Sequence, residues 1–542
     1  CICSPIVDEY GTIYFKNDSA QMMALGSKIK KITVSKLPTQ TTYDIGDVFN
    51  PAGMKVEAVL TNGKRMDIGG HRFFSKDARV TKWWEEIMPT QGALPYDYKK
   101  LGRQIETVPG GPDPETTDRV MLVRNRVSRI YYQKKFFDYP ISMKPQTFKN
   151  MGLSATIKAG CSYMKSTVSK QEETSLENFY INRFGKVLYS MFFEGYTEKL
   201  WGRHPREISA SWGAQRVKGL SIKAVIKDMF GKILPSGNKK EVETSLIEEF
   251  YYPKFGPGQL WETVADLIRE MGGEIRMNSA VHAVHTENGK IVSLGYTDEN
   301  GTEQTIAGDY FLSSMPVKDL IASMQSTPDA VPADIAQIAA GLPYRDFVTV
   351  GLLVDKLNLV NGTDIKTLGN ITPDCWIYVQ DVGVKLGRIQ IFNNWSPYML
   401  PDPEHHVWIG LEYFCNEGDD FWNMSDKDCT EFAIMELIKM GVIHSAANVQ
   451  DSHRERVKKA YPAYFDTYDH MDDLIAYLNR YDNLFCIGRN GQHRYNNMDH
   501  SMATAFEAVD NIRKGITDKN NVWNVNTEQE YHEAKQTEPS AQ

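Results

Sequence analysis

The sequence predicts an α/β fold with a short all-β segment at its N-terminal end. Three observations lead to this prediction. An apolar strand at 484–487 runs through a glycine turn into a helix with Met502, Ala505, Phe506 and Val509 on one face. Residues 140–235 contain few turn-forming residues, which favours a helix-rich part. Residues 344–415 alternate between apolar and polar positions, which is typical of strands.

The N-terminal segment, residues 28–64, is predicted to be short β structure, while residues 1–27 have no assignment. Asn62-Gly63 is a hairpin-type turn. Two stretches, Lys-Leu-Pro-Thr-x-Thr-x-Tyr-x-x-Gly-Asp (36–47) and Gly-Met-x-Val-x-Ala (53–58), resemble the first half of a bacterial immunoglobulin-like repeat. Half a repeat cannot close a sandwich of about seven strands.

The pattern changes at Arg65. A glycine-rich stretch at 66–75 precedes an amphipathic helix through Trp83 and Trp84. A further helix is expected after Gly256-Pro-Gly258, followed by strands at 274–277, 280–286 and 290–296. Residues 515–542 are a polar tail, which is predicted to be disordered after about Lys519.

Composition excludes several classes of protein. The net charge of −8 over 542 residues gives no nucleic-acid footprint. Seven scattered cysteines indicate a reduced chain, and the sequence shows neither a signal pattern nor a membrane span, so a cytoplasmic location is expected. No metal is expected, because His405 and His406 are adjacent and lack a ligand-spacing motif around them.

The glycine turn after residue 487 is a candidate phosphate or flavin contact, because a helix start offers free N–H groups and a positive dipole end. A dinucleotide site normally also has an early strand, then Gly-x-Gly-x-x-Gly, then a helix. That motif occurs nowhere in the chain. The sequence therefore shows the late half of such a site without its early half.

Three motifs carry a resemblance to a known family: Gly69-Gly-His-Arg-Phe73, Gly195-Tyr-Thr-Glu-Lys-Leu-Trp-Gly202, and Gly488-Arg-x-Gly491 with Tyr495 and Asp499. In this order, over residues 65–514, they resemble the FAD-dependent amine-oxidase superfamily. The nearest likeness is to protoporphyrinogen-oxidase-like and UDP-galactopyranose-mutase-like flavoproteins. In the last motif the spacing before Asp499 is slightly longer than in the mutases.

This resemblance implies an FAD-binding, Rossmann-like domain with a mixed-sheet substrate domain and a helical insertion. Residues 140–235 would be the helical substrate part, and residues 480–514 the C-terminal FAD-binding motif. The family's N-terminal βαβ unit is missing and the immunoglobulin-like segment stands in its place, so we expect a fusion or rearrangement near residues 62–65. FAD is the implied cofactor, and its binding by this chain stays open because the main pyrophosphate cradle is absent.

The resemblance also implies site residues. His71 and Arg489 would act at the flavin edge. The alternative for His71 is a histidine that hydrogen-bonds the backbone of a turn, and the alternative for Arg489 is a surface salt bridge. Asp499 is a flavin contact or a helix cap. The expected cofactor-binding residues are Gly69, Gly70, His71, Arg72, Phe73, Val281, Gly488, Arg489, Asn490, Asp499, His500, Ser501 and Met502. The expected substrate residues are Tyr196, Thr197, Trp201, Arg216 and Tyr495. The alternative for Tyr196 and Trp201 is a place in the helix core, and the alternative for Arg216 is a solvated surface.

The sequence is compatible with two functions from different classes of protein. One is a flavoenzyme acting on a small molecule, either by a redox reaction or, as in the mutases, on a nucleotide sugar without net redox change. The other is a non-catalytic chain in which a truncated flavoprotein is fused to a surface-type β module. The sequence gives no oligomeric state.

Overall fold

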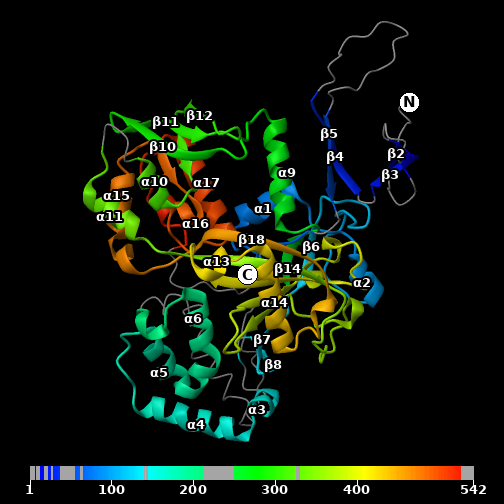
Figure 1. Ribbon diagram of the computed structural model, residues 1–542. Helices are drawn as coiled ribbons and strands as arrows, with labels where there is room; N and C mark the ends of the chain where they lie inside the picture. Colours follow the sequence, from blue (N-terminus) through cyan, green and yellow to red (C-terminus); the bar gives the residue numbers. More distant parts are fainter. Residues whose placement is uncertain are drawn as a thin grey trace, which may run out of the picture. The chain divides into compact units, whose positions relative to one another are not determined.

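The structure, a computed structural model (Figure 1), describes residues 65–139, 141, 145–210, 249–324 and 330–526, together with five strands before residue 62. The chain divides into two compact units. The first comprises Cys1–Met66 with Tyr398–Asp402, and the second comprises Asp67–Pro397 with Pro403–Gln542.

The first unit contains antiparallel strands. β1 (Ile6–Val7), β2 (Ile13–Lys16) and β3 (Met22–Leu25) form one sheet, and β4 (Lys28–Lys36) pairs with β5 (Lys55–Thr61). Strands were expected within residues 28–64, whereas residues 1–27 had no assignment. The immunoglobulin-like reading stays a prediction, because residues 37–54 and 62–64 lie outside the described part.

The largest sheet of the second unit has seven strands in the order β18-β14-β17-β16-β15-β7-β8. β7 and β15 are parallel and the other neighbours antiparallel, so the expectation of a mixed sheet is confirmed. Its strands are β7 (Ser128–Tyr132), β8 (Lys135–Asp138), β14 (Tyr344–Val354), β15 (Trp376–Val379), β16 (Arg388–Ile391), β17 (Val407–Cys415) and β18 (Val449–Pro462).

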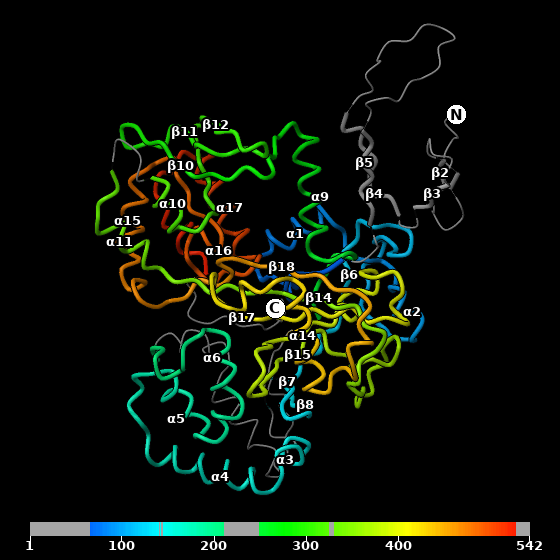
Figure 2. The backbone as a smooth tube through the Cα atoms, viewed as in Figure 1, coloured from blue at the N-terminus to red at the C-terminus, as the bar shows by residue number. Residues whose placement is uncertain are grey.

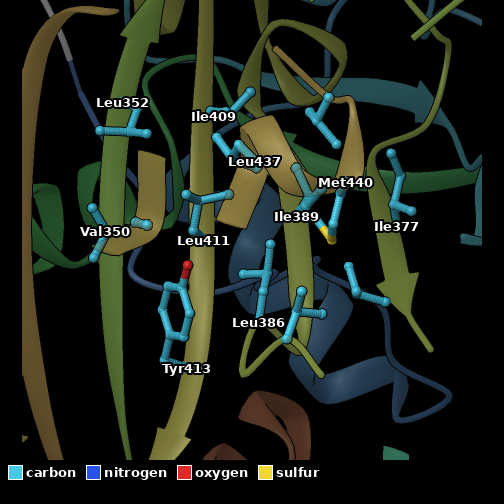
Figure 3. Packing of buried hydrophobic residues seen from close by; sticks show 14 of the residues in the cluster. Val350, Leu352, Ile377, Leu386, Ile389, Ile409, Leu411, Tyr413, Leu437 and Met440 are labelled. Carbon is cyan, nitrogen blue, oxygen red and sulfur yellow. The ribbon is translucent and has the colours of Figure 1, made fainter. Parts of the chain in front are cut away.

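One face of this sheet is the main apolar core. Val350, Leu352, Ile389 and Leu411 point to the same side and pack with α14 (Asp426–Met440), as Figure 3 shows. Because successive side chains of a strand point to opposite faces, the residues between them line the other side. That second face holds polar and aromatic side chains.

A second part of this unit contains the glycine turn. β13 (Phe311–Ser313) pairs in parallel with β19 (Leu484–Cys486), and α16 (Gly488–Gly491) and α17 (Met498–Lys514) follow β19. β10 (Ala280–Glu287), β11 (Lys290–Thr297) and β12 (Glu303–Ala307) form an antiparallel sheet. Around these lie α10 (Val317–Ser323), α11 (Ala333–Gly341), α15 (Met471–Leu478) and α18 (Asn520–Trp523).

Two local predictions were wrong. Residues 274–277 are not a strand, because the left-handed Gly272 (φ 86°) ends the preceding helix in an exposed turn without a ladder. In α17 the buried side is formed by Met502, Ala503, Thr504 and Ala508, while Val509 is 45% exposed.

The helix-rich prediction for 140–235 is confirmed as far as residue 210. This part comprises α3 (Pro145–Met151), α4 (Leu153–Val168), α5 (Leu176–Tyr189), a π-helix (Ser190–Glu194) and α6 (Gly195–Trp201). Figure 2 shows α4 beside α5, and the Ser162 hydroxyl accepts a hydrogen bond from the Val187 N–H there. Residues 211–248 lie outside the described part.

The second unit contains several further helices and strands. The helix predicted through Trp83 and Trp84 is α1 (Ala78–Ile87), and the one after Gly256 is α9 (Pro257–Glu270). The other elements are α2 (Tyr96–Leu101), β6 (Met121–Asn125) paired with β9 (Glu249–Pro253), α12 (Phe392–Trp395) and α13 (Asp420–Asn423).

Candidate active site

The loop that carries His71 is fixed by a buried carboxylate. Asp67 accepts hydrogen bonds from the backbone N–H of Gly69 (3.2 Å) and of His71 (3.0 Å). Its Oδ1 lies 2.6 Å from His71 Nδ1, and the Tyr252 hydroxyl donates to its Oδ2. Desolvation works to lower the pKa of His71, but the charge and hydrogen bond of Asp67 outweigh it, so the pKa is raised.

Gly70 lies against the second face of the seven-stranded sheet. A Cβ at this position would lie 3.0 Å from Gln390 Nε2 and 3.3 Å from the Trp395 ring. The Thr349 hydroxyl also donates to the carbonyl of Ile68 at 2.9 Å. A side chain at position 70 would therefore have to displace Gln390 or Trp395 by a few tenths of an ångström.

A row of side chains crosses the sheet beneath this loop. The strand register places Tyr378, Arg388, Glu412 and Thr349 side by side. Glu412 is 1% exposed, and it accepts from Arg388 Nη1 at 3.1 Å and from Gln390 Nε2 at 2.7 Å. We call Tyr378, Arg388, Gln390, Glu412 and Phe414 the polar face of the sheet.

Helix α6, which contains the Gly195–Gly202 motif, brings Tyr196 to the polar face. The Tyr196 hydroxyl accepts from Arg388 Nε at 2.8 Å, and its ring packs edge-on against Tyr378 at 5.7 Å. Burial raises the pKa of Tyr196, partly offset by the charge of Arg388. The motif thus supplies a tyrosine hydroxyl that stays protonated and is held in position by Arg388.

The rest of the motif attaches α6 to the sheet. Lys199 donates to the carbonyls of Asp381 (2.8 Å) and Leu386 (3.2 Å), which belong to the β15–β16 connection. Desolvation lowers the pKa of Lys199 to about 8. The Arg345 guanidinium donates to the carbonyls of Lys199 and Leu200 at the end of α6. Gly202 leaves room for it, since a Cβ there would lie 2.9 Å from Arg345 Cζ.

Arg489 occupies the far side of the same region. Its guanidinium lies 4.7 Å from the Tyr495 ring and 5.7 Å from the Tyr461 ring, and these two rings stack at 5.6 Å. It donates to the carbonyls of Asn496 (2.7 Å) and Ala460 (3.0 Å). Among the residues that the structure describes, it forms no ion pair with a carboxylate.

Aromatic contacts connect Arg489 with Tyr196. Arg388 lies 5.3 Å from the Phe414 ring, and Phe414 packs edge-on against Tyr461 at 6.0 Å. Two smaller contributions to the pKa of His71 come after desolvation and Asp67. The charge of Arg489 works to lower this pKa and the charge of Glu412 works to raise it, so both groups are within electrostatic reach of His71. The structure therefore brings the three sequence motifs to one place.

Arg72 extends the polar face toward Trp376. The Trp376 ring lies 5.6 Å from the Arg72 guanidinium and 4.9 Å from that of Arg126, and it stacks on Trp395 at 5.5 Å. Such cation–π contacts hold the two guanidinium groups at the Trp376 ring.

The glycine turn after β19 has the geometry of a backbone cradle. Gly488 is left-handed (φ 73°), and a Cβ on Gly491 would lie 2.4 Å from the Ser313 carbonyl at the end of β13. Only glycine allows this close crossing at the carboxyl ends of two parallel strands, where α/β proteins bind nucleotides.

Polar atoms gather at this cradle. Ser313 Oγ, Asn490 Oδ1 and Asp499 Oδ1 are buried and have no hydrogen-bond partner among the described residues. Burial raises the pKa of Asp499 despite the nearby His500. Asn497 and His500 form a capping box at the start of α17. Buried polar atoms without a partner fit a polar ligand at this cradle.

Several predicted site residues have side chains elsewhere. Phe73 (0% exposed) packs against Trp84, and Met502 Sδ accepts from the Trp84 indole at 3.2 Å, so both belong to an apolar core. Met502 was expected to contribute its backbone N–H, and that role stays a prediction. Trp201 packs against Phe465 at 6.0 Å in another core cluster.

The other predicted residues are distributed as follows. Thr197 is buried within α6. Val281 lies on β10 and pairs with Tyr296. Ser501 lies in the first turn of α17, near Gly488. Arg216 lies outside the described residues.

Sequence reasoning missed Asp67, Arg388, Gln390, Glu412 and Tyr461. A signal was present in β16, where Arg388 and Gln390 alternate with isoleucine, and in β17, where Glu412 interrupts an otherwise apolar strand. A buried strand rarely keeps such residues unless they are paired or functional.

The described residues contain neither a candidate metal site nor a candidate membrane-spanning helix. Among the residues that the structure describes, no cluster of three or more His, Cys, Asp or Glu side chains has metal-binding geometry. None of the helices in that part is both long and apolar enough to cross a bilayer.

Comparison with known proteins defines the class. The family model of flavin containing amine oxidoreductases matches residues 55–510, and the chain belongs to this family. Its members are flavin-dependent oxidoreductases, so the family-level prediction of a flavoenzyme is confirmed.

Two solved structures share the fold. A reduced UDP-galactopyranose mutase has 18% sequence identity and a TM-score of 0.63, with 88% of this chain and 90% of that chain covered. A putative protoporphyrinogen oxidase from Exiguobacterium sp. 255-15 has 14% identity and a TM-score of 0.52, with 83% and 88% covered. At these identities the likeness establishes the fold alone.

Proposed function

We propose that this chain is an FAD-dependent enzyme whose substrate is a nucleotide sugar bound over the polar face. The observation that carries the proposal is the convergence of Tyr196, Arg489 and His71 from three distant motifs. A diphosphate suits the guanidinium of Arg489, because a planar cation binds phosphate oxygens well. The rings of Tyr461 and Tyr495 beside it give such a ligand flat surfaces for stacking.

The charged and polar residues on and around the polar face have separate physical tasks in this proposal. Glu412 neutralises Arg388, and Arg388 in turn fixes the Tyr196 hydroxyl as a hydrogen-bonding group toward the substrate. Arg489 binds the anionic part of the substrate. Asp67 holds His71 in one orientation and favours its charged form by raising its pKa.

The cofactor would lie between the His71 loop and the cradle formed by Gly488, Gly491 and the start of α17. When bound, a flavin would supply the reactive ring nitrogen, since no side chain performs this chemistry. The protein would hold the substrate sugar against it and exclude water.

The proposal is tested with the purified chain. It should be yellow or take up added FAD, and after dithionite reduction it should interconvert UDP-galactopyranose and UDP-galactofuranose. Tight UDP binding with oxygen-dependent turnover and no isomerisation would instead show a redox reaction on a nucleotide sugar. Failure to bind UDP would exclude the substrate class.

A non-catalytic chain is the second candidate, and one observation favours it. All described strands ahead of Asp67 are antiparallel, and β13 pairs only with β19 within the described residues. The described part therefore supplies no early βαβ unit for the diphosphate of FAD. A colourless protein that shows no flavin fluorescence quenching on titration with FAD would support this alternative.

A further inference from the structure

Buried His493 lies between Arg489 and Tyr495 in the chain and has no task in the proposed function. Its side chain is 0% exposed, and its backbone is left-handed (φ 47°), a conformation that is uncommon outside glycine. Such a conformation costs free energy and persists only where the surrounding contacts require it. The contacts of the His493 side chain therefore indicate why the fold keeps it.

The imidazole joins this turn to the end of strand β18. His493 Nε2 lies 3.0 Å from the carbonyl oxygen of Ala463, the residue that directly follows β18. Because a carbonyl oxygen only accepts, Nε2 carries the proton and donates it. His493 Nδ1 is buried and has no hydrogen-bond partner among the described residues, so it is the unprotonated nitrogen.

Aromatic rings enclose the imidazole and favour its neutral form. The Tyr344 ring packs edge-on at 4.6 Å, and the Tyr468 ring lies at 5.9 Å. An imidazolium would place a second N–H at Nδ1, where the described residues offer no acceptor. Desolvation lowers the pKa of His493 to about 4, and the charge of Lys318 acts in the same direction. At neutral pH the side chain is therefore a neutral hydrogen-bond donor.

Two further contacts join the same two segments on either side of His493. Arg489 Nη1 donates to the carbonyl of Ala460 at 3.0 Å, and the Tyr495 N–H donates to the Tyr464 hydroxyl at 2.7 Å. The three contacts follow one another in the same order along both segments, with the contact of His493 in the middle. We call them the β18 seam.

We propose that His493 is a positioning residue: it holds Arg489 and Tyr495 opposite Tyr461, the arrangement that binds the diphosphate in the proposed function. One side of the β18 seam carries Tyr461, and the other carries Arg489 and Tyr495. The inference rests on the proposed function, because it takes the ligand of these groups from there.

The middle contact controls the spacing of these groups. Removal of the His493 donor would leave the carbonyl of buried Ala463 without it, and a buried acceptor without a donor costs free energy. The two segments would then shift relative to one another. A displacement of about 1 Å is enough to lower the effectiveness of a binding group about 100-fold.

Isothermal titration calorimetry with UDP and with inorganic pyrophosphate tests the proposal on the full-length protein. His493→Leu removes the donor but keeps a branched side chain, and it should weaken the binding of both ligands about 10- to 100-fold. His493→Gln keeps an N–H donor the same number of bonds from Cα as Nε2, so its affinities should stay within about threefold of wild type. The matched control is His444→Leu at an exposed position, which should leave both affinities unchanged.

A double-mutant cycle separates positioning from a general loss of stability. In an Arg489→Met background, His493→Leu should weaken UDP binding by less than about threefold, because its effect acts through Arg489. Equal losses in the two backgrounds would overturn the proposal. Wild-type UDP affinity in the single variant His493→Leu would also overturn it.

The failure of the proposed function has a different signature. A wild-type protein that binds neither UDP nor pyrophosphate would contradict that function, and amide hydrogen exchange would then decide the role of His493. Exchange in residues 460–464 and 488–497 should become faster in His493→Leu and return to the wild-type rate in His493→Gln. Unchanged exchange in His493→Leu would overturn the positioning role even without a ligand.

Discussion

The hydroxyl of Tyr196 accepts a hydrogen bond from Nε of Arg388 at 2.8 Å, which joins the α6 motif to a strand 192 residues further along the chain. Arg388 is also paired with the buried Glu412. Because a charged donor loses its acceptor if the hydroxyl is removed, this contact should matter for both stability and binding.

Tyr196→Phe should lower the free energy of unfolding by about 1–3 kcal/mol, measured by urea denaturation. Phenylalanine keeps the ring packing against Tyr378 and removes only the acceptor. Tyr310→Phe is the control, since Tyr310 is 51% exposed, and it should change stability by less than about 0.5 kcal/mol. Equal stability of the two variants would contradict a structural role for the hydrogen bond.

Arg489→Met should weaken UDP binding about 10- to 100-fold, because it removes the guanidinium while keeping a long apolar side chain. Isothermal titration calorimetry measures the affinity. Arg489→Lys should restore only part of it, since a point charge cannot bind two oxygens at once. The matched control is Arg513→Met at the exposed end of α17. Unchanged UDP affinity in Arg489→Met would remove Arg489 from the substrate site.

His71 should make stability depend on pH. The folded-state pKa is raised above the ordinary value of 6.5, chiefly through Asp67, against desolvation. The protonated form is therefore favoured by folding, and its contribution is complete below pH 6.5 and is lost as pH rises through the folded-state pKa. Urea denaturation of wild type and His71→Gln should show the larger difference at about pH 5.5 and the smaller at about pH 8.5.

Gly70→Ala should displace the His71 loop, because the added methyl group would lie 3.0 Å from the Gln390 amide and 3.3 Å from Trp395. We expect a loss of about 1–3 kcal/mol in the free energy of unfolding, measured by thermal denaturation. We also expect weaker FAD uptake, measured by flavin fluorescence. Gly258→Ala at the start of α9 meets no atom within 4 Å and should be neutral or stabilising. Normal FAD uptake by Gly70→Ala would refute a tight loop–flavin contact.

The sequence alone placed the glycine turns correctly, for a local reason. Gly488 and Gly491 lie between an apolar strand and an amphipathic helix, and such a turn depends on residues that are neighbours in the chain. The helix through Trp83 and Trp84 was predicted on the same basis. The motif Gly195–Gly202 was singled out from the sequence, but its spacing did not reveal which side chains face the sheet.

Tertiary structure alone decided which side chains meet. Arg388 and Glu412 lie on neighbouring strands, and their contact depends on strand register, which no local pattern specifies. Asp67 meets Tyr252 only because the fold brings two distant segments together. The same holds for Phe73 and Met502, whose side chains pack in a core formed by distant elements. Local chemistry thus determined the turns, helices and family motifs, while the pairing of β15 with β16 brought together Tyr378 and Arg388, the partners of Tyr196, because cross-strand contacts arise only after folding.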